Sequence, residues 1–412
     1  MQPVYARCAG LDVHKKTVVA CVRASQGGGQ VRKQTHTFST MTQDLEALSA
    51  WLAEQGVEQV ALESTGVYWW PVYNILEEHG HTVILVNPQH LKQVPGRKTD
   101  VKDAEWLAEL LQHGLRRASF IPPAAIRTLR ELTRYRKAQV QQRTAELNRL
   151  QKVLESANLK LAAVASDVWG ASGQAMLAAL VRGEEDPEAL ADLAQGLLRH
   201  KLAALAQALE GRVKPHHRTL IGTIMRHIHF LEEAIEQLDA EIAHLLEPLA
   251  ASLTLLLTIP GLNAVSAAAI LAEVGPDLGR FPSAGHLASW AGVCPGNRQS
   301  GGKALSGKTT KGNTWLRGML GEVAWAAIRA KGTAFGARYR RLVRRLGSQK
   351  AVVAVMHHLL LVIYRVLHDQ VPYHELGPDY YHPTAPHRAQ RRLVHGLEQL
   401  GFTVTLTPKE AA

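Results

Sequence analysis

The first 122 residues alternate between apolar runs and amphipathic stretches. Three runs rich in apolar and β-branched residues come first, separated by turn formers, and they predict an antiparallel meander. The predicted strands are 5–13, 17–22, 31–38, 59–63 and 82–86, and the predicted helices are 42–54, 67–79 and one that opens at residue 100. Strands that alternate with helices after a meander indicate an α/β domain with a mixed sheet.

Beyond residue 123 the apolar positions follow the helical period. They recur at steps of three and four residues from 147 to 161 and again from 221 to 245. Such a repeat favours a left-handed coiled coil, but it does not decide whether the two helices pair within one chain or with another subunit. The expected fold class is α/β plus α, with a mixed sheet, long coiled-coil helices and a mainly helical C-terminal part. A short element is expected at 393–406 in the tail.

The chain is basic, with 47 Lys and Arg against 36 Asp and Glu and a net charge of +11. This balance suggests a polyanionic partner such as nucleic acid. The cations concentrate at 127–152, with eight against two acids, and at 303–350, with twelve against one. An ordinary solvated face would carry more acids. The predicted nucleic-acid contacts are Arg130, Arg134, Lys137, Lys303, Lys308, Lys311, Arg317, Arg341, Arg344 and Arg345.

Cysteine usage and hydropathy restrict the class of protein further. The three cysteines show no paired spacing, so a disulfide framework or a structural zinc site is not expected. We find no leader and no uncharged run long enough to span a bilayer. The expectation is a cytoplasmic protein without a membrane partner.

Four carboxylates fall where a binding site would form. Asp12 lies near the end of the first predicted strand, Glu63 ends the strand 59–63, and Asp100 and Asp103 open a helix. Ligands of open α/β sheets bind beyond the carboxyl ends of the strands. Each acid alone is compatible with a strand-end turn or a helix N-terminus. Together they favour two-metal phosphodiester chemistry with Mg²⁺ or Mn²⁺.

A serine lies at the edge of the second basic segment. Ser300 precedes two glycines in a stretch, 294–303, that is dense in turn formers and that we expect to be a loop. Its hydroxyl could attack a phosphate if a base or a metal activated it. The alternative is an ordinary exposed loop serine.

Four blocks of residues resemble one known family. They are 10–15 (GLDVHK), 62–69 (LESTGVYW), 98–104 (KTDVKDA) and 300–303 (SGGK) followed by 311–313 (KGN). In this order they resemble the DEDD transposases of insertion sequences, the IS110 family, over roughly residues 6–160 and 250–335. The chain departs from the family pattern at Gln299, where many relatives have a second serine, in an extended middle section, and in a longer tail.

The resemblance implies a domain order and a chemistry. The expected parts are a RuvC-like (RNase H fold) DEDD domain at 1–122, a basic and coiled-coil connector at 123–250, a serine-bearing transposase domain at 251–371 and a tail at 372–412. Asp12, Glu63, Asp100 and Asp103 would bind the metal, and Ser300 would join covalently to a DNA phosphate. The family also implies a homo-oligomer, a dimer or tetramer. A non-coding guide RNA, the bridge RNA, would pair with donor and target DNA.

The predicted function is therefore an RNA-guided DNA recombinase that mobilises its own insertion sequence, in the cytoplasm and associated with the nucleoid. Two alternatives stay open. One is a metal-dependent junction endonuclease of the RuvC type, in which water attacks and Ser300 is incidental. The other is a non-catalytic coiled-coil protein that binds nucleic acid.

Overall fold

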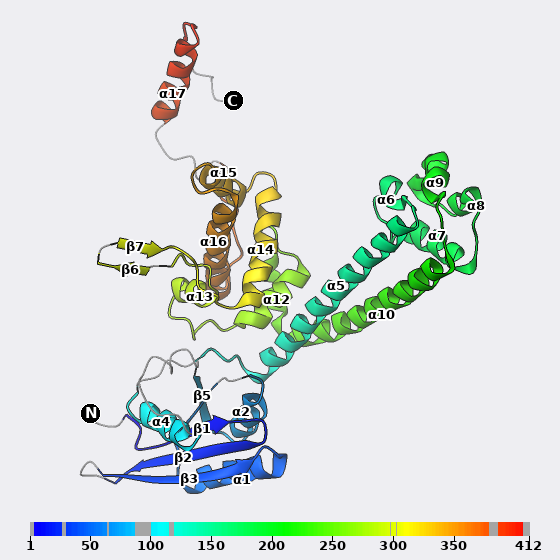
Figure 1. The fold of residues 1–412 in the computed structure, drawn as a ribbon. Helices are drawn as coiled ribbons and strands as arrows, with labels where there is room; N and C mark the ends of the chain where they lie inside the picture. The colour runs from blue at the N-terminus through cyan, green and yellow to red at the C-terminus, as the bar shows by residue number, and fades with distance from the viewer. Residues whose placement is uncertain are drawn as a thin grey trace. The chain divides into compact units, whose positions relative to one another are not determined.

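The chain divides into two compact units, residues 1–121 and 122–412, in a computed structural model (Figure 1). The structure describes residues 4–26, 30–63, 66–86, 100–114, 119–296, 298–301, 303–378 and 386–406. The finer division into four parts stays a prediction.

The first unit contains one five-stranded mixed sheet in the order β3-β2-β1-β4-β5. Its strands are β1 (Arg7–Val13), β2 (Thr17–Ser25), β3 (Val31–Ser39), β4 (Gln59–Glu63) and β5 (Thr82–Val86). β1, β2 and β3 pair antiparallel, whereas β4 pairs parallel with both β1 and β5. The meander and the α/β alternation predicted from the sequence are thus confirmed.

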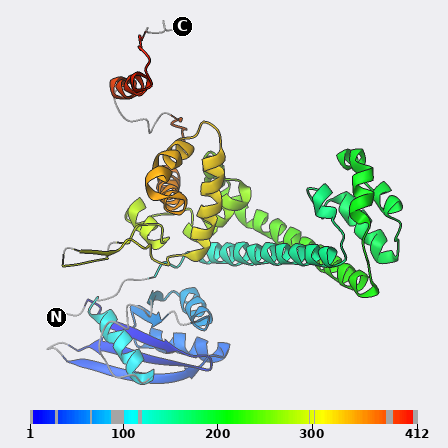
Figure 2. The same ribbon diagram turned by 45° about the horizontal axis from the view of Figure 1, so that its top comes forward.

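Helices cover the two faces of this sheet. α1 (Thr42–Glu54) and α2 (Trp69–Glu78) bury their apolar residues with Leu11 and Leu62 in one core. α4 (Asp100–Gln112), the cyan helix in Figure 2, packs on the side of Cys8 and Gly10. A Cβ atom at Gly10 would lie 2.3 Å from the carbonyl oxygen of Ala104. Glycine at this position therefore lets the helix approach the strand closely.

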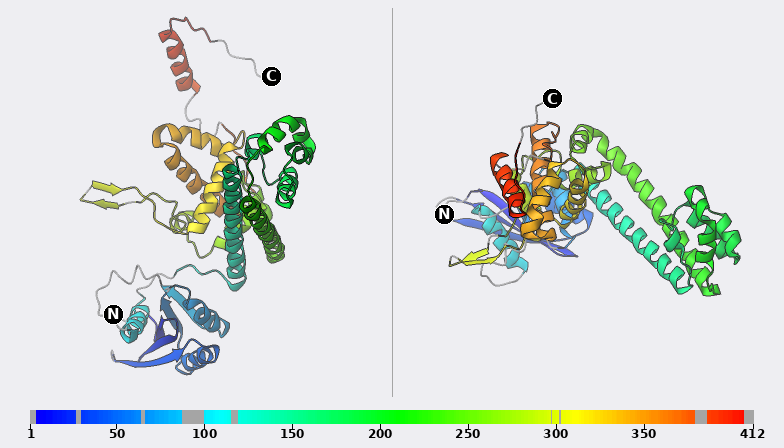
Figure 3. Two further views of the ribbon diagram at one scale, coloured as in Figure 1. Left: turned by 45° about the vertical axis from the view of Figure 1, so that its right-hand side comes forward. Right: turned by 90° about the horizontal axis from the view of Figure 1, so that it is seen from above.

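The second unit begins with two long helices that run side by side, α5 (Ala124–Ser156) and α10 (Pro215–Leu246) (Figures 1 and 3). Ion pairs join Arg136 of α5 to Asp239 of α10, and Arg143 of α5 to Glu232 of α10. A residue further along α5 therefore pairs with a residue earlier in α10. The helices are therefore antiparallel and pair within one chain, which the apolar period left open. The segment that connects them in sequence contains α6 (Leu161–Val164), α7 (Ala171–Arg182), α8 (Pro187–Asp192), η1 (Gly196–Lys201) and α9 (Leu202–Leu209).

The rest of the second unit is a helical body followed by a tail helix. The body contains η2 (Glu247–Leu249), α11 (Ala250–Leu257), α12 (Ala264–Val274), α13 (Ala284–Trp290), α14 (Thr314–Arg329), α15 (Ala334–Leu346) and α16 (Ser348–Asp369). The expected loop at 294–303 is wrong, because β6 (Arg298–Ser300) and β7 (Lys303–Ser306) form a hairpin there. The tail helix, α17 (Pro386–Gln399), begins earlier than the short element expected at 393–406.

Two helical stretches, Pro215–Leu257 and Ser348–Asp369, are long and apolar enough to cross a membrane by length and composition alone. The core helix of a soluble protein passes the same test. In α16, the apolar residues Leu359, Leu360 and Ile363 are fully buried in the protein. The apolar face of α16 is therefore part of the core of the second unit.

Candidate carboxylate centre, serine hairpin and basic surface

Asp12 and Glu63 end neighbouring strands on the same face of the sheet. β1 and β4 pair in parallel, with Leu11 opposite Leu62. Asp12 directly follows Leu11, and Glu63 directly follows Leu62. Side chains two residues apart on a strand share a face. Asp12 therefore lies on the face of Gly10, and Glu63 on the face of Ala61, which is the face that α4 covers. Both acids are half-buried.

The direction of α4 brings its first turn to the same end of the sheet. Cys8 Sγ donates to the carbonyl of Ala108 at 3.4 Å, whereas Gly10, further along the strand, meets Ala104. The helix thus runs antiparallel to β1, and its N-terminus lies towards the carboxyl end of the strand. Asp103, half-buried, directly precedes Ala104. The register therefore carries Asp103 towards Asp12.

Asp100 is the first residue of α4, but its side chain lies outside the described part of the chain. Within the side chains that the structure does describe, no three His, Cys, Asp or Glu residues are grouped closely enough to hold a metal ion. The donor chemistry fits Mg²⁺ or Mn²⁺, because these ions prefer carboxylate oxygens. The metal role of the four acids remains a proposal.

His14 is a neighbour of this centre that the sequence reasoning did not select. Its Nε2 atom lies 3.1 Å from Oδ2 of Asp12, and 47 % of its side chain is exposed. The two residues are two positions apart at the end of β1, in the block Gly10-Leu11-Asp12-Val13-His14-Lys15. The spacing of two residues between Asp12 and His14 was the feature of the sequence from which this contact could have been predicted.

Ser300 lies at the turn of the β6–β7 hairpin, which projects from the helical body in Figures 1 and 3. It pairs across the hairpin with Lys303, and Gly301 in the turn has a φ of +57°. A positive φ favours glycine in a two-residue hairpin turn. The side chains of Ser300 and Lys303 lie outside the described residues. Ser300 belongs to the second unit and the four carboxylates to the first.

Close backbone contacts hold the base of this hairpin. A Cβ atom at Gly296 would lie 2.2 Å from the carbonyl oxygen of Lys308, and one at Gly312 would lie 2.3 Å from the nitrogen of Gly292. Arg317 Nη1 donates to the carbonyls of Gly292 and Thr310, both at 3.0 Å. Arg317, predicted to contact nucleic acid, thus links the two chain segments that flank the hairpin.

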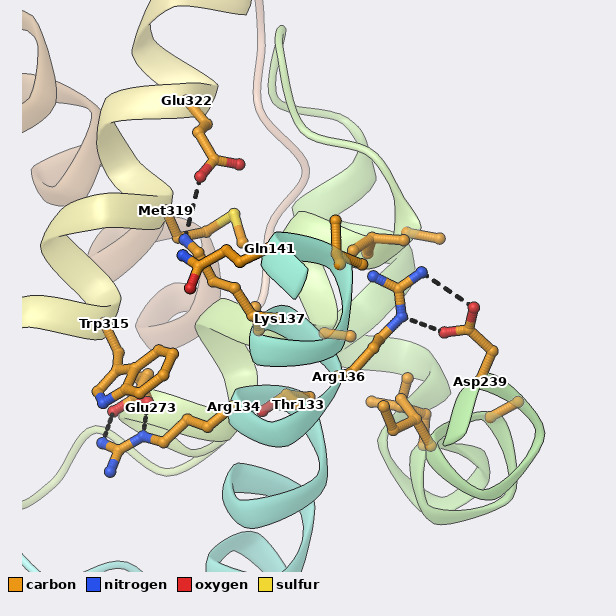
Figure 4. Close-up of a pocket in the computed structure, with 18 residues that line it drawn as sticks. Thr133, Arg134, Arg136, Lys137, Gln141, Asp239, Glu273, Trp315, Met319 and Glu322 are labelled. Atoms are coloured by element: carbon orange, nitrogen blue, oxygen red, sulfur yellow. Dashed lines mark hydrogen bonds and ion pairs between the residues drawn. The ribbon is translucent and has the colours of Figure 1, made fainter. Parts of the chain in front are cut away.

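A buried glutamate, Glu273 on α12, organises the start of α5. Arg134 donates to its two carboxylate oxygens at 2.7 and 2.8 Å (Figure 4). Asn313 Nδ2 donates to Oε2 of the same carboxylate at 2.6 Å. Arg130 donates to the carbonyls of Ala272 and Glu273 at 3.0 and 2.6 Å. Burial lowers the pKa of Arg130 to about 10, although Glu273 opposes the shift. Sequence reasoning missed Glu273, whose signal was a lone acid in an apolar helix.

The cations of α5 and α15 differ in their partners. Besides Arg130 and Arg134, Lys137 donates to Glu322 at 3.0 Å, so all three predicted contacts on α5 make bonds inside the protein. On α15, Arg341, Arg344 and Arg345 are exposed and form no ion pair with a carboxylate in the described ranges. Arg341 and Arg345 line a hollow of about 390 Å³ together with Arg338 and Leu342. Lys308 and Lys311 are also exposed.

Comparison with known proteins identifies the class. One family model, described as a transposase of the DEDD IS110 type, matches residues 9–159. A second, described as Transposase IS116/IS110/IS902 family, matches residues 253–340, and together they cover more than half of the chain. The protein is a DNA transposase or recombinase. It belongs to the IS110 family of insertion-sequence transposases.

Curated relatives agree with this assignment. The chain is 25 % identical over 339 residues to the putative transposase y4qE of Sinorhizobium fredii, covering 77 % of this chain and 70 % of the relative. It is 25 % identical over 294 residues to the transposase for insertion sequence element IS1111A of Coxiella burnetii, covering 70 % and 72 %. It is also 25 % identical over 381 residues to the pilin gene-inverting protein of Moraxella bovis, covering 88 % and 96 %.

Among solved structures, RuvC of Thermus thermophilus is similar to 27 % of this chain over 99 % of its own length, at 17 % identity and a TM-score of 0.22. The expected fold class, an α/β unit with a mixed sheet followed by a mainly helical part, is confirmed by the mixed sheet and by the helical second unit.

Proposed function

We propose that this transposase cuts and rejoins DNA through a covalent phosphoserine intermediate formed by Ser300. Asp12, Glu63, Asp100 and Asp103 would hold Mg²⁺ or Mn²⁺ in the first unit. The observation that carries the proposal is the placement of Asp12, Glu63 and the first turn of α4 at one end of the sheet and on one face. Carboxylates brought to one end of the sheet repel one another, and divalent cations bound by their oxygens would offset that repulsion.

The chemistry divides between the two sites. The hydroxyl oxygen of Ser300 attacks the scissile phosphorus, the bond from phosphorus to one strand breaks, and that strand leaves with a hydroxyl end. The phosphoserine bond keeps the phosphodiester energy, so a second strand hydroxyl can displace the serine and rejoin the DNA. A divalent metal held by the four carboxylates would supply charge stabilisation to the phosphate.

The proposed partners follow from the same scheme. Donor and target DNA would contact exposed cations such as Arg341, Arg344 and Arg345 through their phosphates. A non-coding guide RNA would read the sequence by base pairing, and the protein would act as a homo-oligomer inside the cell. Strand exchange that proceeds equally well without RNA transcribed from the flanking DNA would contradict the guide.

The test compares Ser300→Ala with Ser306→Ala, a second serine of the same hairpin, on labelled donor DNA with Mg²⁺. Ser300→Ala should abolish the protein–DNA adduct that survives denaturation, and it should abolish strand exchange, whereas Ser306→Ala should keep both. Cleavage that persists in Ser300→Ala at the unaltered rate would favour the junction endonuclease.

A second pair of variants tests the carboxylate centre. Asp12→Asn should lower cleavage by a factor of 100 or more, on the order expected when a group that stabilises transition-state charge is removed. Asp44→Asn, an acid of α1 on the opposite face of the sheet, is the matched control. Full cleavage activity in Asp12→Asn would contradict the carboxylate centre. Nucleic-acid binding without any cleavage, even by the unaltered protein, would favour the non-catalytic nucleic-acid-binding protein.

A further inference from the structure

An apolar groove lies where α5 and α10 meet α12 and α14. It has a volume of about 340 Å³, and its apolar lining includes Val140, Ile242, Leu246, Val265, Trp315 and Met319. Three ion pairs belong to its lining, Arg136 with Asp239, Arg134 with Glu273 and Lys137 with Glu322 (Figure 4). Three cations are thus matched by three acids, so the lining carries no excess positive charge to attract a polyanion.

The α10 side of the groove is acidic. Residues 232–247 contain six acids and no Lys or Arg. Glu236, which lies one helical turn before Asp239 of the groove lining, has no ion-pair partner in the described part of the chain. A nucleic-acid backbone would be repelled here, whereas a basic helix with one apolar face would be attracted.

The chain contains one helix of that kind. α17 carries three arginines and one acid within Pro386–Gln399. Leu393 and Leu397, and Leu400 just beyond the helix, are 64 %, 44 % and 72 % exposed. Their spacing of i, i+4 and i+7 is the pattern of a helix that docks its apolar face into a groove. Phe402 and Leu406 extend the exposed apolar surface.

We propose that this groove receives α17 of a second copy of the same chain. The groove supplies apolar surface beside the acidic stretch 232–247 of α10, and α17 supplies leucines and arginines. Within a single chain the leucines of α17 stay exposed, which is costly for a large apolar patch and argues for a partner molecule. The inference extends the homo-oligomer of the proposed function. Its test uses no DNA, so that either proposal can fail alone.

The test is a disulfide between copies of the full chain. One copy carries Val265→Cys in the groove. The other copy carries Leu397→Cys on α17 and a longer tag, so that the two copies differ in size. The side chains of Val265 and Leu397 are each 44 % exposed. Cys294→Ser is included in every chain, and the buried Cys8 and Cys21 are kept because burial raises their thiol pKa values. A mixed disulfide between the two tagged copies is expected. Pairing Leu397→Cys with Leu197→Cys, an exposed leucine of η1, should give none.

A chain that carries both cysteines distinguishes the alternatives. In one outcome, a disulfide forms within this doubly substituted chain but no mixed disulfide forms between copies. That result would show that α17 fills the groove of its own molecule, and it would overturn the proposal. No disulfide in either experiment would overturn it as well.

Sedimentation of the full chain gives a second measurement. Leu397→Asp should weaken self-association about tenfold or more, because burial of one leucine contributes at least that factor. His395→Ala, on the opposite face of α17, should leave association unchanged, and circular dichroism checks that both variants fold. Unchanged association in Leu397→Asp would contradict the docked helix.

Discussion

α5 and α15 are both arginine-rich, yet their charges are used differently. The cations at the start of α5 are bound to Glu273, Glu322 and backbone carbonyls, and they hold the helix against α12 and α14. The exposed arginines of α15 have no carboxylate partner in the described ranges. Charge density along the sequence therefore identifies basic segments, but the distribution of acids in space decides which cations remain available to a polyanion.

The largest expected effect comes from breaking the α5 network. Arg134→Ala leaves Glu273 buried with Arg130 and Asn313 as its remaining partners, and it should lower the free energy of unfolding by about 3 kcal/mol. Arg136→Ala, whose partner Asp239 is 44 % exposed, is the control and should cost less than about 1 kcal/mol. Urea unfolding measures both. Equal losses in the two variants would remove the distinction between buried and exposed pairs on α5.

The second effect concerns binding through α15. Replacing Arg341, Arg344 and Arg345 together by Ala should weaken affinity for duplex DNA about 100-fold at moderate salt. It should also reduce the slope of log K against log salt by about 2–3, because about three phosphate contacts are lost. The free energy of unfolding should stay within about 0.5 kcal/mol of the original. A titration in which Arg136→Ala weakens binding as much as the α15 triple variant would reverse the comparison.

The third effect is a loss of stability in acid. Burial lowers the pKa of His358 on α16 to about 4 from 6.5, with Arg338 of α15 as the next cause. Because the folded protein holds this histidine neutral, the stability it contributes is present above pH 6.5 and is lost as the pH falls towards 4. We expect a decrease of about 1–2 kcal/mol between pH 7 and pH 5. His358→Gln should reduce this pH dependence, whereas His395→Ala, at an exposed histidine of α17, should retain it.

Much of the fold could be predicted because the signals were local. β4 and β5 are apolar runs bounded by polar residues, and α1 has one clear amphipathic period, so their ends matched the prediction. The β6–β7 hairpin was missed because strands of three and four residues are too short to show alternation. The pairing of α5 with α10 was left open because a heptad repeat identifies the apolar face of a helix but not the helix against which that face packs.

The candidate site was predictable to a different degree in each part. Asp12 and Glu63 were recognisable because each lies at or near the end of an apolar strand. The sequence predicted a mixed sheet but did not predict that β1 pairs in parallel with β4. Glu273 could not be selected in the same way, because its partners Arg134 and Asn313 are 139 and 40 residues away in sequence. A buried ion pair of this kind leaves no periodic pattern, so only the folded chain reveals it.

Gly10 has a consequence for the spacing of the carboxylates. Because glycine has no side chain, the backbone of α4 lies directly against the backbone of β1 at this residue, and this contact sets the distance between strand and helix. Asp12 projects from the strand two residues beyond that contact, and Asp103 lies on the helix one residue before it. An added methyl group would push the helix outwards and widen the distance between Asp12 and Asp103, so Gly10 controls the spacing of the two carboxylates to which we assign a metal.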